Sequence, residues 1–256
     1  MVSYTGRHAK LYDIFYAEKP YKEEAAFVHS CIQQYGIGTT NTILELACGT
    51  GSHAFALESF GYKITASDSS RDMLQCAKEK GVLRQSSVNF RLQDMREWDN
   101  AGGPYDAMIC LFDSIGYVVT NPGLLKVLQG VSQNLRPNGL FIFEFWHAAA
   151  MIKSYSPLRV RKWEVPEGEI LRVSETELDI ASQLAKVNYS VFELRNDGTY
   201  LSFQESQVNR YFLIQEMENW LSRCSFDVVK WFSGYSNNET IDDRTWHIVA
   251  VARLQA

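Results

Sequence analysis

Two glycines, Gly49 and Gly51, stand one residue apart in the stretch 42–54. They follow, after Cys48, a stretch, 43–47, in which four of the five residues are apolar. Glycine tolerates the backbone angles of a tight turn and lets the backbone approach a ligand closely. The first N–H groups of the following helix are free to bind that ligand. This order of strand, glycine-rich turn and helix predicts a nucleotide-binding corner.

Acidic residues follow two further predicted strands, Asp68 after 62–67 and Asp94 after 88–92. Gly49, Gly51 and Ala54 satisfy the dinucleotide-binding pattern literally, and Asp68 then stands where a ribose-binding acid belongs. A nicotinamide cofactor is therefore one alternative. Two features oppose it. The first glycine of that pattern should follow the strand directly, where this chain has Ala47, and the chain ends in strand–loop–strand.

The elements around these residues alternate between strand and helix. Strands are predicted at 42–47, 62–67, 88–92, 105–111 and 140–145, and helices at 52–59, 71–80 and 122–135. Such alternation is typical of βαβ units and a parallel sheet. Helical spacing of apolar residues also predicts two helical pieces within 4–35, separated at Pro20.

Beyond Trp146 the pattern changes to a period of two. Runs at 170–178, 184–194 and 200–211, with the hairpin signal Asn196-Asp197-Gly198, predict an inserted antiparallel sheet. A helix at 213–224 and strands at 226–232 and 246–254 follow. We therefore expect one domain from 1–150 and 212–256, and an insertion at 151–211 that covers the acceptor site.

The segment Glu-Leu-Ala-Cys-Gly-Thr-Gly, residues 45–51, resembles motif I of the class I S-adenosylmethionine-dependent methyltransferases. Asp68 matches the acid that closes their second strand, and Asp94-Met95 matches the pair that flanks adenine. The resemblance implies an α/β fold with a Rossmann-like seven-stranded sheet and helices on both faces. It also implies S-adenosyl-L-methionine as cofactor and S-adenosyl-L-homocysteine as product.

A narrower resemblance concerns the segments 11–21 and 112–117 and the antiparallel insertion. Together they look like small-molecule N-methyltransferases, of which those acting on deoxyaminosugars are the nearest. The chain departs from that pattern at Tyr117, where some of those enzymes have histidine, and at Asp113, where a small hydroxyl residue is common. These departures leave a different amine open as the acceptor.

The family resemblance assigns roles around the cofactor. The Gly49 turn would take the methionine part, with its carboxylate bound by backbone N–H groups and by a tyrosine hydroxyl. Asp68 would accept the ribose hydroxyls, Asp94 the adenine amine, and Glu45 would orient the cofactor amine. The full predicted cofactor set is Tyr12, Tyr21, Glu45, Ala47, Gly49, Gly51, Asp68, Ser69, Met73, Asp94, Met95 and Leu111.

Methyl transfer from a sulfonium is an in-line displacement with an activated donor, so the protein mainly positions the reactants and excludes water. For an amine acceptor, one group must hold or remove the ammonium proton. The candidates follow the fourth and fifth strands, where ligands of open α/β sheets bind: Asp113, Tyr117, Glu144 and His147. His147 has a suitable ordinary pKa, but a histidine after a strand also fits a structural role.

Two further groups of side chains bear on anion binding and on metal binding. Arg159, Arg161 and Lys162 open the insertion and could bind a substrate diphosphate, or simply form a solvated strand edge. The five cysteines form no CxxC pair and the histidines show no ligand spacing, so no metal site is expected.

Composition limits the partners. The chain has 256 residues, a net charge of −5 and no basic run, which argues against a nucleic-acid partner. No apolar stretch is long enough for a membrane span, and scattered cysteines suit reduced thiols, so a cytoplasmic protein is expected. The sequence favours a small polar acceptor, with an amine first and a homodimer left open. The alternatives are an O-methyltransferase, an RNA or protein methyltransferase, and a cofactor-binding sensor without turnover.

Overall fold

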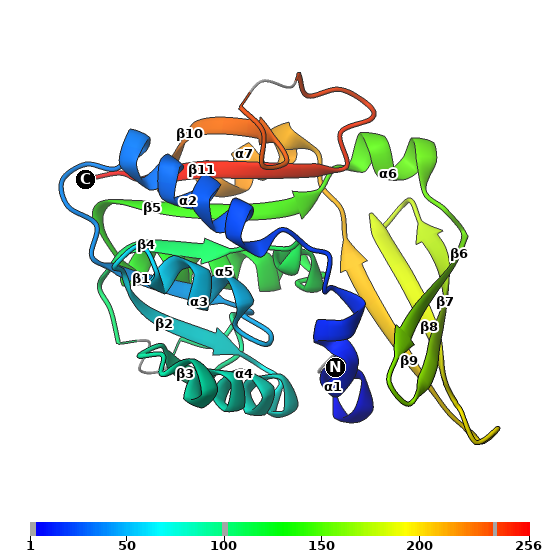
Figure 1. Ribbon diagram of the computed structural model, residues 1–256. Coiled ribbons are helices and arrows are strands. Elements are labelled where there is room, and N and C mark those ends of the chain that lie inside the picture. Colours follow the sequence, from blue (N-terminus) through cyan, green and yellow to red (C-terminus); the bar gives the residue numbers. More distant parts are fainter. Residues whose placement is uncertain (1–3, 99–101, 238–239) are drawn as a thin grey trace.

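The computed structural model describes residues 4–98, 102–237 and 240–256 (Figure 1). Its centre is a seven-stranded sheet in the order β10-β11-β5-β4-β1-β2-β3. The strands are β1 (Thr42–Leu46), β2 (Lys63–Asp68), β3 (Asn89–Leu92), β4 (Tyr105–Cys110), β5 (Leu135–Trp146), β10 (Phe226–Ser233) and β11 (His247–Leu254). Strands β1 to β5 are parallel, and β11 runs antiparallel between β5 and β10. This order confirms the predicted methyltransferase-type sheet.

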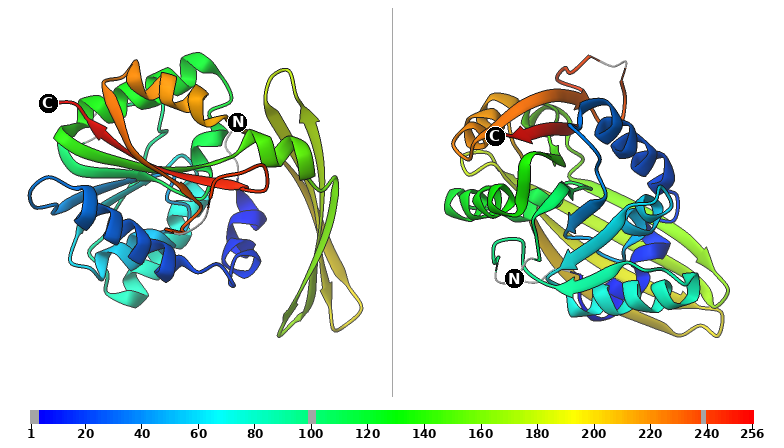
Figure 2. Two further views of the ribbon diagram at one scale, coloured as in Figure 1. Left: turned by 90° about the horizontal axis from the view of Figure 1, so that it is seen from above. Right: turned by 90° about the vertical axis from the view of Figure 1, so that its left-hand side faces the viewer.

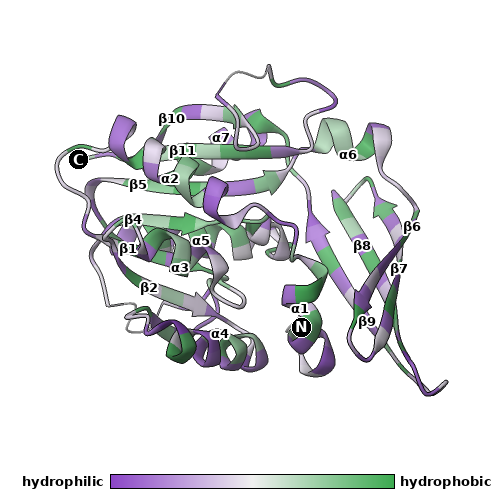
Figure 3. Cartoon of the chain, in the orientation of Figure 1, coloured by the Kyte–Doolittle hydropathy of each residue, from purple (hydrophilic) through white to green (hydrophobic). Residues whose placement is uncertain are grey.

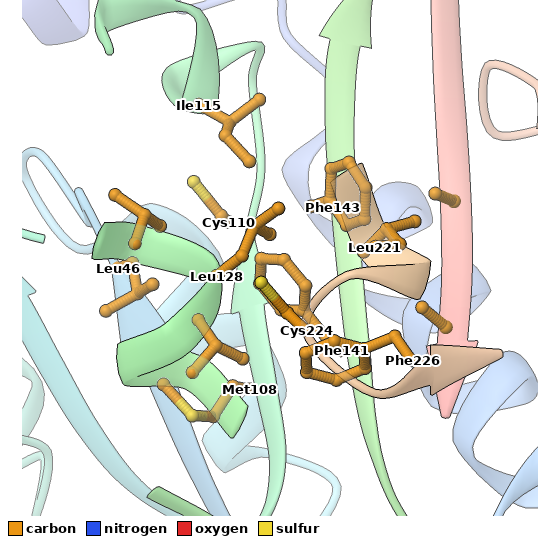
Figure 4. Packing of buried hydrophobic residues seen from close by; sticks show 14 of the residues in the cluster. Leu46, Met108, Cys110, Ile115, Leu128, Phe141, Phe143, Leu221, Cys224 and Phe226 are labelled. Atoms are coloured by element: carbon orange, nitrogen blue, oxygen red, sulfur yellow. The ribbon is translucent and has the colours of Figure 1, made fainter. Parts of the chain in front are cut away.

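Helices cover both faces of this sheet. Residues of α2 (Tyr21–Tyr35), α3 (Ser52–Glu58) and α4 (Arg71–Arg84) belong to the apolar cluster on one face, and residues of α5 (Asn121–Asn134) and α7 (Ile214–Ser222) to the cluster on the other. Neighbouring residues of one strand therefore enter opposite clusters. Met108 of β4 and Phe141 of β5, for example, pack toward α5 and α7 (Figure 4), whereas the next residues, Ile109 and Ile142, belong to the opposite cluster. Burial on both faces explains the continuous apolar runs in β4 and β5.

The sequence Pro137-Asn138-Gly139, which is typical of a turn, lies within β5. Pairing with β4 jumps from Leu135 opposite Tyr105 to Leu140 opposite Ala107, and Asn138 has a positive φ of 65°. The segment is therefore an irregularity at the start of the strand, and the regular pairing begins at the residue where the sequence placed it.

A separate antiparallel sheet lies beside the central one, in the order β6-β7-β8-β9 (Figure 2). Its strands, β6 (Leu158–Val165), β7 (Gly168–Asp179), β8 (Leu184–Arg195) and β9 (Tyr200–Arg210), all fall within 151–211. Hydrophilic and hydrophobic residues alternate along them (Figure 3). The period-two runs in the sequence predicted three of these strands. They missed the edge strand β6, whose side chains are mostly exposed, and the short helices α6 (Ala148–Ser154) and η1 (Ser114–Tyr117).

The helix α1 (Gly6–Phe15) lies between the two sheets (Figure 1). Tyr12 packs on Met73 of α4, whereas Leu11 and Phe15 pack on the antiparallel sheet. His8 also lies 2.7 Å from the Glu205 carboxylate of β9. The first helix therefore joins the two sheets. Among the described residues, no helix combines the length and apolar character needed to cross a membrane.

Candidate active site

A cavity of about 1200 Å³ lies between the carboxyl ends of the parallel strands, α1 and the antiparallel sheet. Eleven of the sixteen predicted site residues line it: Tyr12, Ala47, Gly49, Asp68, Ser69, Met73, Asp94, Met95, Asp113, Tyr117 and Glu144. Of the other five, Tyr21, Glu45 and Leu111 line a small pocket of about 30 Å³ that shares Tyr12 and Ala47 with the cavity. Gly51 and His147 line neither.

The turn after β1 follows left-handed backbone angles. Ala47 has a φ of 52°, Gly49 of 56° and Gly51 of 80°. The Gly49 N–H donates to Asp68 at 2.8 Å, which ties the turn to the end of β2. A Cβ on Gly51 would lie 2.9 Å from the Phe90 ring. Gly51 therefore allows close packing beneath the turn, and its cofactor contact stays a prediction.

Asp68, predicted to bind the ribose hydroxyls, ends β2 and lines the cavity. Its carboxylate accepts the N–H groups of Gly49 and Ser70, at 2.8 and 2.7 Å, while lining the cavity. Burial raises the pKa of this carboxyl, although those backbone donors oppose the rise. Asp94 lines the same part of the cavity and pairs with Arg96, whose guanidinium lowers the pKa of Asp94.

The small pocket contains two buried polar atoms without a hydrogen-bond partner in the described chain, Glu45 Oε2 and Tyr21 OH. Burial raises the pKa of Glu45 to about 8, and the nearby Asp68 adds to that shift. An ammonium and a carboxylate entering beside Ala47 would give both groups partners. The residues therefore fit the amino-acid end of S-adenosylmethionine, with the nucleoside end toward Asp68 and Asp94.

The other end of the cavity holds three interacting ionisable groups. His247 Nδ1 lies 2.9 Å from Asp113 Oδ2 and 3.1 Å from Glu144 Oε1. The two carboxylates are buried, whereas the His247 side chain is 43% exposed. Glu144 Oε2 also accepts the Phe112 N–H at 2.6 Å and the Tyr235 hydroxyl at 2.7 Å. The cluster joins the ends of β4, β5 and β11.

The pKa values of this cluster move in different directions. The Asp113 carboxylate holds the pKa of His247 far above its ordinary range. Burial raises the pKa of Asp113 in spite of that cation. Burial alone would also raise the pKa of Glu144, but the hydrogen bond and charge of His247 hold it low. The ligand atoms of the three groups lie within 4.8 Å of one another, a spacing that could hold a metal cation. With its raised pKa, however, His247 is protonated and supplies the positive charge of the cluster itself.

The loop that carries Asp113 is strained. Phe112 and Asp113 have consecutive positive φ values of 54° and 56°, and neither is glycine. Such angles persist where surrounding contacts enforce them, and they often occur at functional sites. Further along this loop, a Cβ on Gly116 would lie 1.8 Å from the Asn209 amide oxygen. Glycine at this position lets η1 press directly against β9.

The two remaining predicted catalytic residues occupy different surroundings. The Tyr117 hydroxyl lines the cavity, lies 2.7 Å from the Tyr4 hydroxyl and donates to Gln207 at 3.3 Å. His147 lies at the start of α6, outside both pockets, with Nδ1 3.1 Å from the Thr245 carbonyl oxygen. Burial lowers the pKa of His147. Its contacts are those of a structural histidine at a strand–helix junction.

Sequence reasoning did not identify His247 or the polar residues of the antiparallel sheet that line the cavity, among them Arg172, Tyr189, Gln207 and Asn209. His247 did carry a signal, because it begins a predicted final strand. In the structure it pairs with Trp146, two residues beyond Glu144. An antiparallel partner for the fifth strand would have placed a histidine near that acid.

Comparisons with known proteins find methyltransferases among the relatives of this chain. Residues 43–139 match a family model described as "Methyltransferase domain". "Putative methyltransferase YqeM" of Bacillus subtilis (strain 168) is 26% identical over 90% of each chain. The "dTDP-3-amino-3,6-dideoxy-alpha-D-glucopyranose N,N-dimethyltransferase" of Streptomyces fradiae is 28% identical over 73% of this chain and 72% of its own.

The fold is shared with solved structures. An S-adenosylmethionine-dependent methyltransferase from Clostridium acetobutylicum ATCC 824 superposes with a TM-score of 0.82 at 23% identity, over 97% of this chain and 98% of that one. The sheet order, the turn after β1 and the acids after β2 and β3 agree with that assignment. The chain is a class I S-adenosylmethionine-dependent methyltransferase.

Proposed function

We propose that this enzyme methylates the amine of a small molecule bound in the large cavity. The observation that carries this proposal is the cluster of Asp113, Glu144 and His247. Two carboxylates and one imidazolium leave one net negative charge in a buried site, which suits an ammonium. A neutral hydroxyl acceptor would leave that charge without a partner.

The same cluster can manage the proton. An amine attacks the methyl carbon through its lone pair, so a protonated amine must first lose a proton to a nearby base. S-adenosylmethionine supplies the electrophilic methyl group. Asp113, with its raised pKa, is the better acceptor of that proton, whereas Glu144 is already held by Phe112 and Tyr235. We assign Asp113 the role of base and Glu144 the role of positioning residue.

Further support comes from the relatives and from the second sheet. The Streptomyces fradiae relative carries an aminosugar nucleotide in its name, and it is similar to this chain over most of its length. Residues of β7, β8 and β9 line the cavity beside Asp113 and Tyr117. The insertion 151–211 then covers the acceptor, while 1–150 and 212–256 bind the cofactor.

The test measures transfer of labelled methyl from S-adenosylmethionine to paired acceptors that differ only by an amine or a hydroxyl. Amines should be methylated and their hydroxyl counterparts should not. Asp113→Asn should lower kcat by about 10²-fold or more, the range expected for loss of a general base. Asp243→Asn removes an exposed carboxylate, 56% accessible, and is the matched control.

Three outcomes would contradict the proposal. Preferential labelling of hydroxyls would identify an O-methyltransferase. Labelling of RNA or protein alone would move the acceptor out of the small-molecule class. Tight binding of S-adenosylhomocysteine without transfer to any acceptor would favour a sensor.

A further inference from the structure

Arg172 of β7 is a buried guanidinium that lines the cavity. Only 7% of the residue is exposed. Four aromatic rings surround its guanidinium carbon, with centroids 4.7 Å away for Phe15, 5.5 Å for Tyr16, 5.1 Å for Trp163 and 5.2 Å for Tyr189. The immediate contacts of the guanidinium are therefore aromatic.

This guanidinium lacks an anionic partner within the described part of the chain. Its Nε and Nη1 have no hydrogen-bond partner, and none of the ion pairs among the described residues includes it. Arg210 of β9 is a matched comparison, since it is 6% exposed. Arg210 donates to Asn121 at 2.7 Å and to Glu216 at 2.6 Å. The fold pairs one buried arginine of this sheet and leaves the other unpaired.

An unpaired buried cation is costly, because desolvation is not repaid by an opposite charge. Contacts with aromatic faces recover part of that cost. The acids of the neighbouring strands do not help, since Glu193 pairs with Arg7 and Glu205 with His8. An anion entering from the cavity would supply the missing partner.

Two more arginines stand on the same face of the sheet. Arg161 of β6 is directly opposite Arg172 in the strand pairing, and Arg159 is opposite Ser174. Both line the cavity and both are exposed. Successive residues of a strand point to opposite faces, so Lys162 lies on the other face, where it pairs with Glu169. Three guanidinium groups therefore face one side of the cavity.

We infer that Arg172, with Arg159 and Arg161, binds an oxyanion of the acceptor, and that the acceptor carries an amine at one end and an anionic group at the other. This inference rests on the proposed function, because it takes the cavity to be the acceptor site. Guanidinium matches the oxygens of both phosphate and carboxylate, and several arginines together favour phosphate.

The experiment measures binding of pyrophosphate, and separately of succinate, to the enzyme saturated with S-adenosylhomocysteine, by calorimetry. Saturation keeps the anion away from the cofactor site. Arg172→Met should weaken anion binding by about tenfold or more, and Arg161→Gln by about threefold or more, because each removes a charge-assisted contact. Lys162→Gln is the matched control on the opposite face and should leave the affinity unchanged.

Thermal unfolding supplies a second readout. Without anion, Arg172→Met should unfold at a temperature no lower than the wild type, because an apolar residue replaces an unpaired charge. Pyrophosphate should raise the unfolding temperature of the wild type and not of Arg172→Met. If Arg172→Met fails to fold, the double variant Arg159→Gln/Arg161→Gln carries the binding test.

Binding of pyrophosphate that depends on Arg172 identifies a phosphate site, and binding of succinate alone with the same dependence identifies a carboxylate site. Equal binding by wild type and by the arginine variants, or no binding of either anion, overturns the inference. Methyl transfer to amines that lack an anionic group is measured in the same variants. The absence of transfer would count against the proposed function, whereas the binding result would still decide whether the anion site exists.

Discussion

The two ends of the cavity are built from different kinds of chain segment. The cofactor end comes from consecutive units of one sheet, the turn after β1, the end of β2 and the end of β3, within residues 45–95. The acceptor end joins Asp113 to His247, which are 134 residues apart, and faces strands of a second sheet. Local motifs therefore describe the first end, and only tertiary structure assembles the second. The two ends should also be separable by mutation.

The largest expected effect is at the acceptor end. Glu144→Gln removes one of the two carboxylate charges beside His247, and it weakens the hydrogen bonds from the Phe112 N–H and the Tyr235 hydroxyl. We expect kcat to fall by about 10²-fold, the loss that misplacement of a reacting group by about 1 Å can cause, because Glu144 positions His247 and the Phe112 backbone. The affinity for S-adenosylhomocysteine, measured by calorimetry, should stay within about twofold, because Glu144 lies outside the small pocket and is not among the predicted cofactor contacts. A parallel loss of both quantities would mean that the two ends are coupled.

The converse change is at the cofactor end. Asp68→Asn replaces a carboxylate that already accepts two backbone N–H groups and lines the cavity. The affinity for S-adenosylhomocysteine should fall by about 10- to 100-fold, since hydrogen bonds to charged groups contribute about 1.5–3 kcal/mol. At saturating cofactor, kcat should change much less. Asp72→Asn, at an exposed position in the first turn of α4, makes the same chemical change outside the cavity and serves as the control.

These contrasts also explain what the sequence could predict. Alternation of strands and helices predicted the parallel sheet, and the family resemblance assigned Gly49, Asp68 and Asp94 to the cofactor. All three residues line the cavity, because each follows a strand of the same parallel sheet. Sequence alone did not distinguish Gly51 from Gly49. The difference depends on Phe90, a ring from another strand, which occupies the space of a Gly51 Cβ.

The residues of the acceptor end could not be predicted from local sequence patterns. His147 was one of four candidate bases because it follows the fifth strand, yet it lies outside the cavity, and His247 of β11 is the histidine beside Glu144. Arg172 looked like any other charged residue on an alternating strand. Its burial depends on four aromatic side chains from α1, β6 and β8. Neither placement follows from the spacing of residues within one segment.

The pH dependence of the unfolding free energy tests the role of Glu45 at the cofactor end. Burial raises the pKa of Glu45 to about 8, above the ordinary value of 4.5. The unfolded chain therefore loses this proton at lower pH than the folded chain, and stability falls as pH rises from 4.5 toward 8. Glu45→Gln cannot ionise, so without cofactor it should be more stable than the wild type at about pH 8, by about 1–2 kcal/mol.

The same variant should bind S-adenosylhomocysteine more weakly, because the ligand amine loses a charged partner. Urea unfolding at about pH 5 and about pH 8 measures the first effect, and calorimetry measures the second. Glu218→Gln, at an exposed position of α7, is the control. A variant that loses both stability and affinity would show that Glu45 is held by contacts within the protein.

The smallest effect concerns His247 and the sign of its charge. Its pKa is raised in the folded protein, chiefly by Asp113. A raised pKa contributes stability that is fully present below the unfolded value of about 6.5 and is lost as pH rises through the folded value. The difference in unfolding free energy between wild type and His247→Gln should therefore shrink between about pH 7 and pH 10. The difference will be modest, because solvent screens a side chain that is 43% exposed.

Urea unfolding at several pH values gives this difference directly. His29→Gln alters a histidine of α2 that bonds to the Tyr62 hydroxyl, and it serves as the control. A difference for His247→Gln that stays constant with pH would mean that the imidazole acts through packing and hydrogen bonds and not through its charge. The acceptor end would then hold two net negative charges. In that case one carboxyl must be protonated before a singly charged amine can be matched, because like charges in one buried site raise each other's pKa.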